Sequence, residues 1–278
     1  MAISWHDLST MHEVKRYQVR GVPGEVSRLD FNGRTVEFWS PKQPASHLLI
    51  AHDGQNVFDG RTSTHRGQTW KMAQSAIRVS KELGITPPSI IAIWHSSTKA
   101  DPWGRAKDLT PERYFREGLS VPTEYQKVFN PEALHGDSYL TSIFDEYVPA
   151  LAPGIPAEQI AMIGSSMGGL ATLYALANFS ERFTTALALS PHWPFGGEAL
   201  VDRTISSLPA PSKYKVWMSH GTKGLDRDYL PFQQIADQLM KSRGYHEDNF
   251  RSKRFIRSGH NERSWAKYLH EPLNFWLN

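Results

Sequence analysis

The sequence predicts an α/β protein with a mostly parallel sheet of eight strands and helices on both faces. Short apolar or β-branched segments alternate with longer segments of helical periodicity along most of the 278 residues. Several strand segments are continuously apolar, as in residues 90–94, which is typical of strands buried on both faces of a sheet. The dipeptide Asn32-Gly33 comes before this alternation and predicts a hairpin, so the sheet is expected to begin with antiparallel strands.

Each predicted element follows from a local pattern. The hairpin strands are 26–31 and 34–40, on either side of Asn32-Gly33. The later strands are short, rich in apolar residues and bounded by turn residues: 47–51, 90–95, 160–163, 185–189, 214–219 and 251–256. The expected helices have apolar residues every three to four positions: 68–83, 139–151, 167–178, 198–207, 229–243 and 261–277.

Residues 96–138 do not follow this alternation. The segment is rich in Pro, Gly, Arg and aromatic residues, and a long excursion of this kind inside a domain is usually functional or disordered. We consider two interpretations, a surface loop with a short helix at 111–117 and a cap or lid over a substrate cleft. No repeat, low-complexity tract or Gly/Ser linker divides the chain, so residues 1–278 are expected to form a single domain.

Composition excludes several classes of function. With no cysteine, the chain has no disulfide, no Cys-ligated zinc or iron–sulfur cluster and no thiol nucleophile. Lys and Arg number 31 against 28 Asp and Glu, a net charge of +3, and the basic residues are scattered, so no nucleic-acid partner is expected. The apolar runs are far shorter than the roughly 20 residues of a membrane span. The N-terminus lacks the layout of a signal peptide, so we expect a cytoplasmic protein without a membrane partner.

The sequence Gly164-Ser165-Ser166-Met167-Gly168 carries the strongest chemical signal. It lies between a predicted buried strand and a predicted helix, where Gly-x-Ser-x-Gly is typical of a nucleophile elbow. Small residues two positions on either side let the chain make a sharp turn, which raises the Ser166 hydroxyl above the sheet. The same turn directs the Met167 N–H and the N-terminus of the helix toward a developing oxyanion. A phosphate-binding loop is the alternative, but its Gly-Lys-Ser/Thr and Gly-x-Gly-x-x-Gly signatures are missing.

A nucleophilic serine needs a base and a carboxylate that orients the base. His260 follows the last predicted strand, the position of the histidine in the chain order Ser–Asp–His. His192 and His220, also at strand ends, are weaker candidates for the base. Asp226 is the first choice for the acid because it follows the preceding strand, and Asp228 is the second choice, with helix N-capping as its structural alternative.

A second oxyanion donor is expected in the loop after the third strand, 51–59. Gly54 would let this backbone approach a ligand, so the N–H of Gln55 is the candidate. His52 and Asp53 lack a third ligand at suitable spacing, so we expect them to hold the loop by buried hydrogen bonds and expect no metal and no cofactor.

Three segments together resemble a known family: 52–59 (HDGQNVFD), 164–169 (GSSMGG) and 259–265 (GHNERSW). They are similar to the putative-esterase family of α/β-hydrolases, especially its enterochelin-esterase-like and feruloyl-esterase-like branch. Residues 105–111 (RAKDLTP) and 190–193 (SPHW) also resemble segments of the enterochelin-esterase-like branch. The resemblance implies the α/β-hydrolase fold, Ser166 as nucleophile, His260 as base and an acid in the loop 221–228. This sequence departs from enterochelin esterases proper in its short N-terminal part, where we expect no room for their separate β-domain, so catecholate siderophores are only one possible class of substrate.

The expected function is therefore a serine carboxylic-ester hydrolase that uses Ser166, His260 and Asp226, forms an acyl-enzyme and acts on a small-molecule ester. Trp193 is a candidate wall of the substrate pocket or a packing aromatic. His192 and Arg105 are the other candidate substrate-binding residues, although Arg105, Arg113 and Arg116 also fit a solvated face. Acyl transfer to an alcohol, as in mycolyltransferases, and a non-catalytic binding protein on the same scaffold are the alternatives. Oligomeric state is left open.

Overall fold

A computed structural model describes residues 11–65 and 67–278. It confirms the α/β fold with a mostly parallel sheet. Within the described residues the sheet has nine strands in the order β1-β2-β3-β5-β4-β6-β7-β8-β9, one more than expected. The strands are β1 (Met11–Tyr17), β2 (Val26–Phe31), β3 (Arg34–Trp39), β4 (Leu48–Ala51), β5 (Ser89–Ile93), β6 (Ile160–Ser165), β7 (Thr185–Leu189), β8 (Lys215–His220) and β9 (Phe250–Arg254).

The additional strand, β1, pairs antiparallel with β2. Its sequence, MHEVKRY, is largely polar and its side chains are exposed or only partly buried. An edge strand of this kind has no buried face to impose an apolar alternation. For that reason the sequence pattern did not indicate β1.

The antiparallel part ends where β3 pairs with β5, and the strands from β5 to β9 all run parallel. Parallel strands have their carboxyl ends at one edge of the sheet, where the loops after β4, β6, β7, β8 and β9 meet. This edge gathers the segments that carry the predicted site residues.

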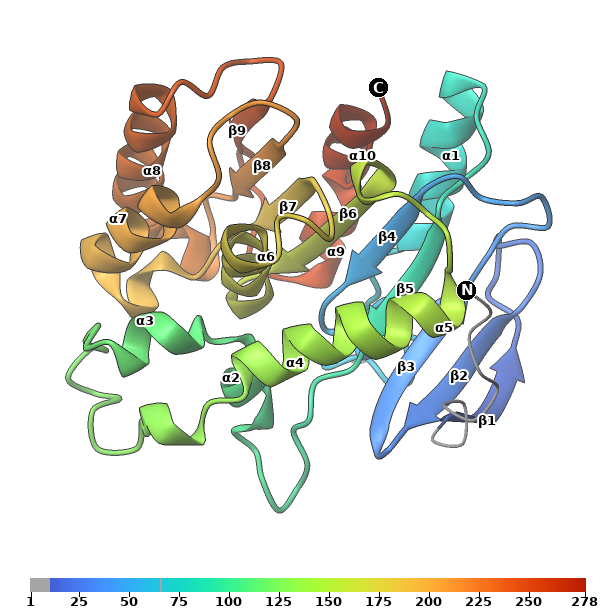
Figure 1. Ribbon diagram of the computed structural model, residues 1–278, viewed down its shortest axis with the longest axis horizontal. Helices are drawn as coiled ribbons and strands as arrows, with labels where there is room; N and C mark the ends of the chain where they lie inside the picture. The colour runs from blue at the N-terminus through green and yellow to red at the C-terminus, as the bar shows by residue number, and fades with distance from the viewer. Residues whose placement is uncertain (1–10, 66) are drawn as a thin grey trace.

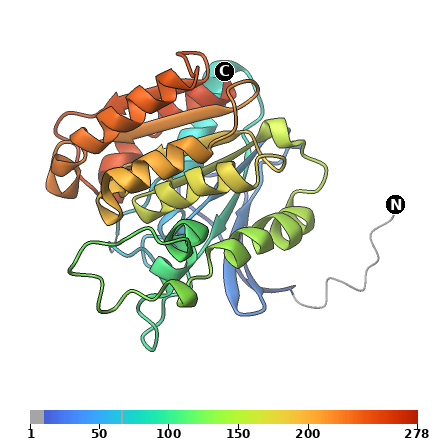
Figure 2. The same cartoon turned by 60° about the vertical axis from the view of Figure 1, so that its left-hand side comes forward.

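Two apolar cores lie on opposite faces of the sheet. One contains side chains of α4, α6, α7 and α8, and the other those of α1, α9 and α10, with α1 packed against α10. Figures 1 and 2 show these two layers, with α4 and α5 crossing the sheet in front of its strands. The helices are α1 (Met72–Leu83), α2 (Gly104–Leu109), α3 (Glu112–Arg116), α4 (Gly136–Ser142), the π-helical η4 (Ile143–Tyr147), α5 (Val148–Leu151), α6 (Met167–Asn178), α7 (Gly197–Ser207), α8 (Leu230–Ser242), α9 (Glu262–Tyr268) and α10 (His270–Leu277).

Two predicted helices are interrupted, each near a proline. The helix expected over 139–151 widens into the π-turn η4 before Pro149, which has no N–H to donate to the preceding turn. The helix expected over 261–277 is divided at Leu269, because the ring of Pro272 would clash with the carbonyl of Tyr268 in a continuous helix.

Residues 96–138 contain α2, α3 and the 3-10 turn η3 (Pro131–Ala133) before the start of α4. The predicted short helix at 111–117 corresponds to α3. In Figures 1 and 2 this green segment lies beyond the strands of the sheet, next to α6. Among the residues described, no helix is long and apolar enough to cross a bilayer.

Candidate active site

Ser166 lies on the sharp turn between β6 and α6. Its backbone has φ 57° and ψ −122°, a conformation that costs a non-glycine residue about 1–3 kcal/mol. The turn is tight because Gly164 and Gly168 are in contact: a Cβ on Gly164 would lie 2.3 Å from the Gly168 carbonyl oxygen. Only glycine fits at 164, as expected for a turn that presents a serine at the carboxyl edge of a sheet.

The neighbouring loop after β7 fixes this turn from one side. The Ser166 N–H donates to the Leu189 carbonyl (3.0 Å), and the His192 N–H donates to the Ser166 carbonyl (3.2 Å). These two bonds fix the backbone of His192 beside the serine.

His260 and Asp226 are paired as predicted from their places in the sequence. Nδ1 of His260 lies 2.7 Å from Oδ1 of Asp226, and the aspartate side chain is completely buried. The other oxygen, Oδ2, accepts hydrogen bonds from the Gly221 N–H (2.7 Å) and the Ser190 hydroxyl (3.0 Å). Asp228, the second choice for the acid, is exposed.

The loops that carry Asp226 and His260 are joined by backbone bonds. The N–H groups of Thr222 and Lys223 both donate to the Ser258 carbonyl at 2.9 Å. Lys223 and Gly259 also form an isolated parallel bridge. The loops of Asp226 and His260 therefore continue the pairing of β8 with β9 beyond the strand ends.

Tyr229 lies beside both Ser166 and His260. Its ring centroid is 5.7 Å from that of His260, and its hydroxyl is hydrogen-bonded to Nδ1 of His192. Burial raises the pKa of Tyr229, while the adjacent Ser166 hydroxyl acts to lower it. Within the described part of the chain, Ser166 and His260 make no direct hydrogen bond with each other, which is common in sites without substrate.

The loop after β4 packs against the first turn of α6. A Cβ on Gly168 would lie 3.2 Å from Cβ of His52 and 3.4 Å from Oδ2 of Asp53. The N–H groups of Asn56 and Val57 are bonded within this loop, whereas that of Gln55 has no acceptor among the described residues. The loop that carries the Gln55 N–H therefore lies against the helix turn that carries the Met167 N–H.

Gly54 lies against the backbone of the neighbouring strand. A Cβ at this position would lie 2.5 Å from the carbonyl carbon and oxygen of Ala92 in β5. Glycine is required here by the neighbouring strand, whatever the ligand.

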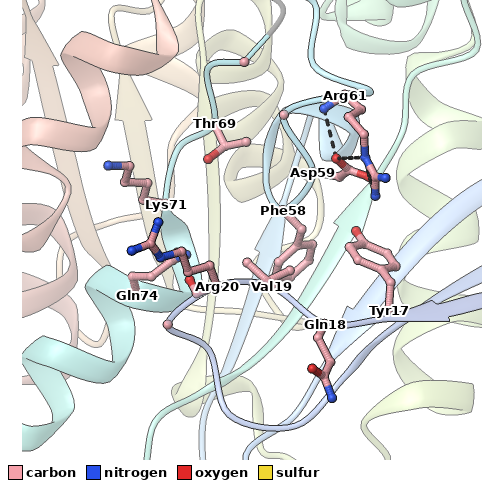
Figure 3. A pocket seen from close by; sticks show the side chains of 13 residues that line it. Tyr17, Gln18, Val19, Arg20, Phe58, Asp59, Arg61, Thr69, Lys71 and Gln74 are labelled. Atoms are coloured by element: carbon pink, nitrogen blue, oxygen red, sulfur yellow. Dashed lines mark hydrogen bonds and ion pairs between the residues drawn. The ribbon is translucent and has the colours of Figure 1, made fainter.

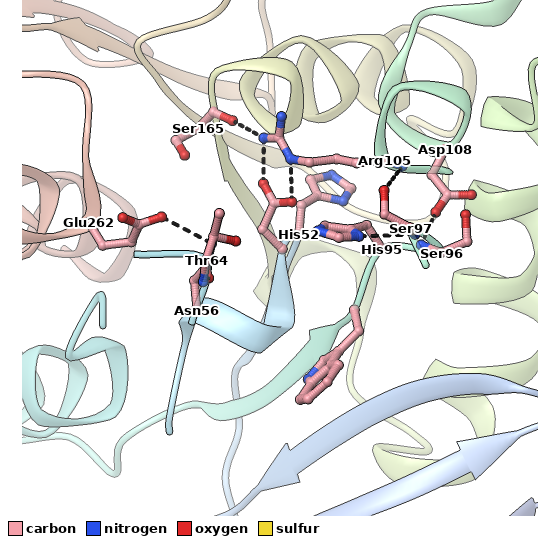
Figure 4. Close-up of polar contacts among 12 residues, drawn as sticks. His52, Asn56, Thr64, His95, Ser96, Ser97, Arg105, Asp108, Ser165 and Glu262 are labelled. Carbon is pink, nitrogen blue, oxygen red and sulfur yellow. Dashed lines mark hydrogen bonds and ion pairs between the residues drawn. The ribbon is translucent and has the colours of Figure 1, made fainter. Parts of the chain in front are cut away.

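Arg105, a candidate substrate-binding residue, forms an ion pair with Asp53, and Figure 4 shows Arg105 beside His52 and Ser165. Its Nε and Nη2 lie 2.7 Å from the two carboxylate oxygens of Asp53. Burial alone would raise the pKa of Asp53, but the Arg105 charge and hydrogen bonds outweigh it and hold the pKa below its usual value. Nη2 of Arg105 also lies 3.5 Å from the Ser165 carbonyl. Arg105 therefore links α2, the loop after β4 and the Ser166 turn.

His52 holds the same loop, as predicted. Its Nδ1 is 2.7 Å from the Tyr139 hydroxyl, and burial lowers the pKa of His52 to about 4. Across residues 11–65 and 67–278, no group of three or more His, Asp or Glu side chains could hold a metal ion.

Glu262, two residues after His260, connects this part of the chain to the loop after β4. One of its oxygens accepts from Nδ2 of Asn56 (3.0 Å), and the other lies 2.7 Å from Nδ1 of His65. Asn56 in turn accepts from the Thr64 N–H (2.8 Å). Figure 4 shows Glu262 and Asn56 facing each other across the two loops.

A cavity of about 390 Å³ opens beside Met167 and His192. Residues of the 96–138 segment form most of its wall, and Phe195 completes it. The wall residues from that segment are mainly apolar or aromatic: Trp103, Ala106, Lys107, Tyr125, Val128, Phe129, Asn130, Ala133 and Leu134.

Trp193 lies in the core and not on this wall. Its side chain is completely buried, and its indole N–H donates to Oε1 of Gln233 at 3.3 Å. The surroundings of Trp193 are those of a packing aromatic. Phe195, two residues later, lines the cavity.

A larger hollow, of about 630 Å³, lies elsewhere (Figure 3). Its lining combines Tyr17, the last residue of β1, and Arg20 with Phe58, Arg61 and Lys71. It contains none of the predicted catalytic or oxyanion residues, so its size does not make it the candidate active site.

Sequence reasoning missed Ser190 and Tyr229 as parts of this site. Ser190 has φ 45° and its hydroxyl donates to Asp226 while accepting from the Trp265 indole (3.2 Å). Ser190 directly follows a buried strand, and this position could have indicated that it lies at the carboxyl edge of the sheet with the other site residues. Tyr229 had no such signal, because it occupies an ordinary position at the start of α8.

Comparisons with known proteins identify a family and similar folds. A family model described as putative esterase matches residues 33–275. Similar solved structures include the BES protein from Bacillus cereus (18% identity, TM-score 0.62, 99% of this chain and 97% of that chain). The enterobactin and salmochelin hydrolase IroE is 18% identical with a TM-score of 0.61, over 95% of this chain and 94% of that chain. The siderophore hydrolase EstA from Aspergillus nidulans is 18% identical with a TM-score of 0.56, over 99% and 98%. No curated protein matches the sequence significantly.

Proposed function

The chain belongs to the putative-esterase family and is a carboxylic ester hydrolase, and from this premise we propose that Ser166, His260 and Asp226 form its catalytic triad. One observation carries the proposal: the 2.7 Å contact between His260 Nδ1 and the buried Asp226 carboxylate, at the same sheet edge as the strained Ser166 turn. A carboxylate only accepts hydrogen bonds, and Asp226 accepts from the Ser190 hydroxyl, the Gly221 N–H and His260. The proton of His260 is therefore on Nδ1, which leaves Nε2 as the base.

The proposed reaction begins when His260 Nε2 takes the Ser166 proton as the oxygen attacks the ester carbonyl. The serine–histidine hydrogen bond forms in the complex with substrate. The oxyanion accepts hydrogen bonds from the Met167 and Gln55 N–H groups, at the N-terminus of α6 and in the adjoining loop. His260 then protonates the leaving alcohol, and an acyl group remains on Ser166. A water, deprotonated by His260, hydrolyses this acyl-enzyme and restores the serine.

The cavity supports a substrate with a bulky apolar or aromatic part. Trp103, Tyr125, Phe129 and Phe195 surround a space of about 390 Å³ beside the oxyanion donor Met167. Similar structures are named as hydrolases of enterobactin, salmochelin and siderophores. We therefore propose an ester with an aromatic or similarly bulky group, with residues 96–138 acting as a cap over it.

The test is labelling with a fluorophosphonate, followed by intact-mass measurement and peptide mapping. We expect one adduct, on Ser166, and none in the Ser166→Ala variant. A folded Ser165→Ala variant is the matched control and should label like the wild type. Absence of labelling in a folded wild-type protein, or an adduct on another residue, would overturn the triad.

The acyl-enzyme has its own test. Esters of one acid with different leaving alcohols are hydrolysed in the presence of methanol, and the ratio of methyl ester to free acid is measured. A common acyl-enzyme predicts the same ratio for every leaving alcohol. Ratios that vary with the alcohol would show that water attacks the ester directly.

A further inference from the structure

His192 faces the cavity from a fixed position. Its N–H is bonded to the Ser166 carbonyl (3.2 Å), and its imidazole lines the cavity together with Met167. Nδ1 of His192 is bonded to the Tyr229 hydroxyl, which is buried. Nε2, on the opposite edge of the ring, has no hydrogen-bond partner among the described residues. The edge with Nε2 is therefore the one available to a ligand.

The hydrogen bond to Tyr229 fixes which nitrogen of His192 carries the proton. Burial keeps the phenol protonated and lowers the pKa of His192 to about 4, so both groups are neutral near pH 7. A phenol O–H is a stronger hydrogen-bond donor than an imidazole N–H, and a neutral imidazole nitrogen is a stronger acceptor than a phenol or alcohol oxygen. The Tyr229 hydroxyl therefore donates its hydrogen to Nδ1 of His192 and not to the adjacent Ser166. The ring proton of His192 then resides on Nε2.

His260 has the opposite arrangement. Its Nδ1 faces the Asp226 carboxylate, which only accepts, so the proton is on Nδ1 and Nε2 has the free lone pair. The two rings lie 6.5 Å apart between centroids. Two histidines of one site thus differ in tautomer because one Nδ1 meets a carboxylate and the other a phenol.

We infer that His192 is a substrate-binding residue that donates its Nε2–H to an oxygen atom of the substrate close to the scissile ester, with Tyr229 as the positioning residue. The ligand class is an ester with an ether, hydroxyl or carbonyl oxygen within a few bonds of the reacting carbonyl. The same tautomer excludes His192 as a second base. This inference rests on the proposed function, since it takes the cavity to be the place where the ester binds.

The first test measures tautomers by ¹⁵N NMR of histidine side chains in the wild-type protein near pH 7.5. Signals are assigned with His192→Gln and His260→Gln variants. We expect His192 to be protonated on Nε2 and His260 on Nδ1. In Tyr229→Phe, His192 should gain the Nδ1–H form, whereas Tyr245→Phe, whose hydroxyl donates to the Pro209 carbonyl, should leave it unchanged. A wild-type His192 protonated on Nδ1 would overturn the inference.

The second test compares esters that differ by one oxygen. The two esters of the first pair share an alcohol and differ in the acid, butyrate or methoxyacetate. The two esters of the second pair share an acid and differ in the alcohol, 1-butanol or 2-methoxyethanol. For each pair, kcat/KM of the ester with the additional oxygen is divided by kcat/KM of the hydrocarbon ester. This ratio is compared between wild type and His192→Phe, so the difference in intrinsic reactivity between the two esters cancels. We expect the ratio to fall about 3- to 10-fold in one pair, the worth of a neutral hydrogen bond. Unchanged ratios in both pairs would refute a donor role for His192.

The two tests separate this inference from the triad proposal. Fluorophosphonate labelling of Ser166 does not depend on His192, so labelling combined with unchanged ester ratios rejects only the role of His192. Failure to label, with the expected tautomers in the NMR spectrum, rejects the triad while leaving the Tyr229–His192 pair in place.

Discussion

Arg105 and Asp53 are joined by two hydrogen bonds of 2.7 Å although they lie 52 positions apart in the chain. Asp53 directly precedes Gly54 and Gln55, and its own backbone has a positive φ of 53°. Arg105 belongs to α2, in the segment that forms most of the cavity wall. This pair therefore connects the cavity wall to the loop that carries the proposed oxyanion donor.

We expect Arg105→Met to lower kcat about 10- to 100-fold with little change in KM, because a small displacement of the Gln55 N–H weakens binding of the transition state more than of the substrate. Arg105→Lys should recover only part of the activity, since lysine cannot bond both carboxylate oxygens in parallel. Arg113→Met, which removes the more exposed pair with Asp137, is the control. Steady-state kinetics distinguish the alternatives: a rise in KM alone would show that Arg105 binds substrate directly.

Replacing the proposed acid should separate Asp226 from Asp228. We expect Asp226→Asn to lower kcat by about 10³- to 10⁴-fold, because an amide in place of the carboxylate favours the wrong tautomer of His260. Asp228→Asn, an exposed position two residues later, should stay within about twofold of the wild type. Both variants are measured with the same ester, after circular dichroism establishes that they are folded. Equal losses in the two variants would contradict the assignment of Asp226.

The strain at Ser166 should be measurable as stability. Glycine tolerates φ 57° and ψ −122°, whereas alanine does not, so Ser166→Gly is expected to be more stable than Ser166→Ala by about 1 kcal/mol. Urea unfolding of the two variants provides the comparison. If the alanine variant were the more stable of the two, the turn would not be under strain.

Acid should destabilise the protein through its buried neutral histidines. Burial lowers the pKa of both His52 and His192 to about 4 in the folded protein, against 6.5 in the unfolded chain. The unfolded state therefore binds protons first as the pH falls. The stabilising contribution is complete above pH 6.5 and is lost toward pH 4, with a slope of about 1.4 kcal/mol per pH unit for each group.

Urea unfolding at several pH values checks this dependence. His192→Gln should remove one group's share of the slope. A His192→Gln slope equal to that of the wild type would show that His192 does not resist protonation in the folded state.

The apolar wall of the cavity should select substrates by size. Trp103 lines the cavity and is about half exposed (52%), so Trp103→Ala removes contact area from a bulky ligand. We expect KM for an ester with an aromatic group to rise about 5-fold or more, while an acetate ester is little affected. Leu225→Ala is the control, because Leu225 is equally exposed (58%) but does not line the cavity. Equal effects on both esters would contradict a role for Trp103 in selecting substrates.

Patterns with a local cause could be predicted from the sequence. The strand, turn and helix around Ser166 were predictable because small residues at fixed spacing and continuous apolar runs impose them. Helix α6 has the bounds that its periodicity indicated, residues 167–178. The proximity of His260 and Asp226 was predictable because each follows a strand of the parallel sheet, and the carboxyl ends of neighbouring parallel strands lie at the same edge.

Features that depend on contacts distant in sequence could not be predicted in this way. Nothing near Arg105 indicates that its partner is Asp53, and nothing near Gly54 indicates the contact with Ala92. The burial of Trp193 beside the cavity-lining His192 depends on the direction of each side chain after Pro191, which composition does not reveal. The polar edge strand β1 lacks the one-sided burial that makes a strand visible in a sequence.

The bonds between the Thr222–Lys223 backbone and Ser258 have a mechanical consequence. They join the loops of Asp226 and His260 into one body, so a fluctuation that carries His260 away from the sheet edge carries Asp226 with it. The proposed nucleophile Ser166 is tied to the same body through the loop after β7, because the Leu189 carbonyl accepts from the Ser166 N–H and the Ser190 hydroxyl donates to Asp226. The relative positions of the three proposed catalytic residues are therefore set by bonds within the protein itself.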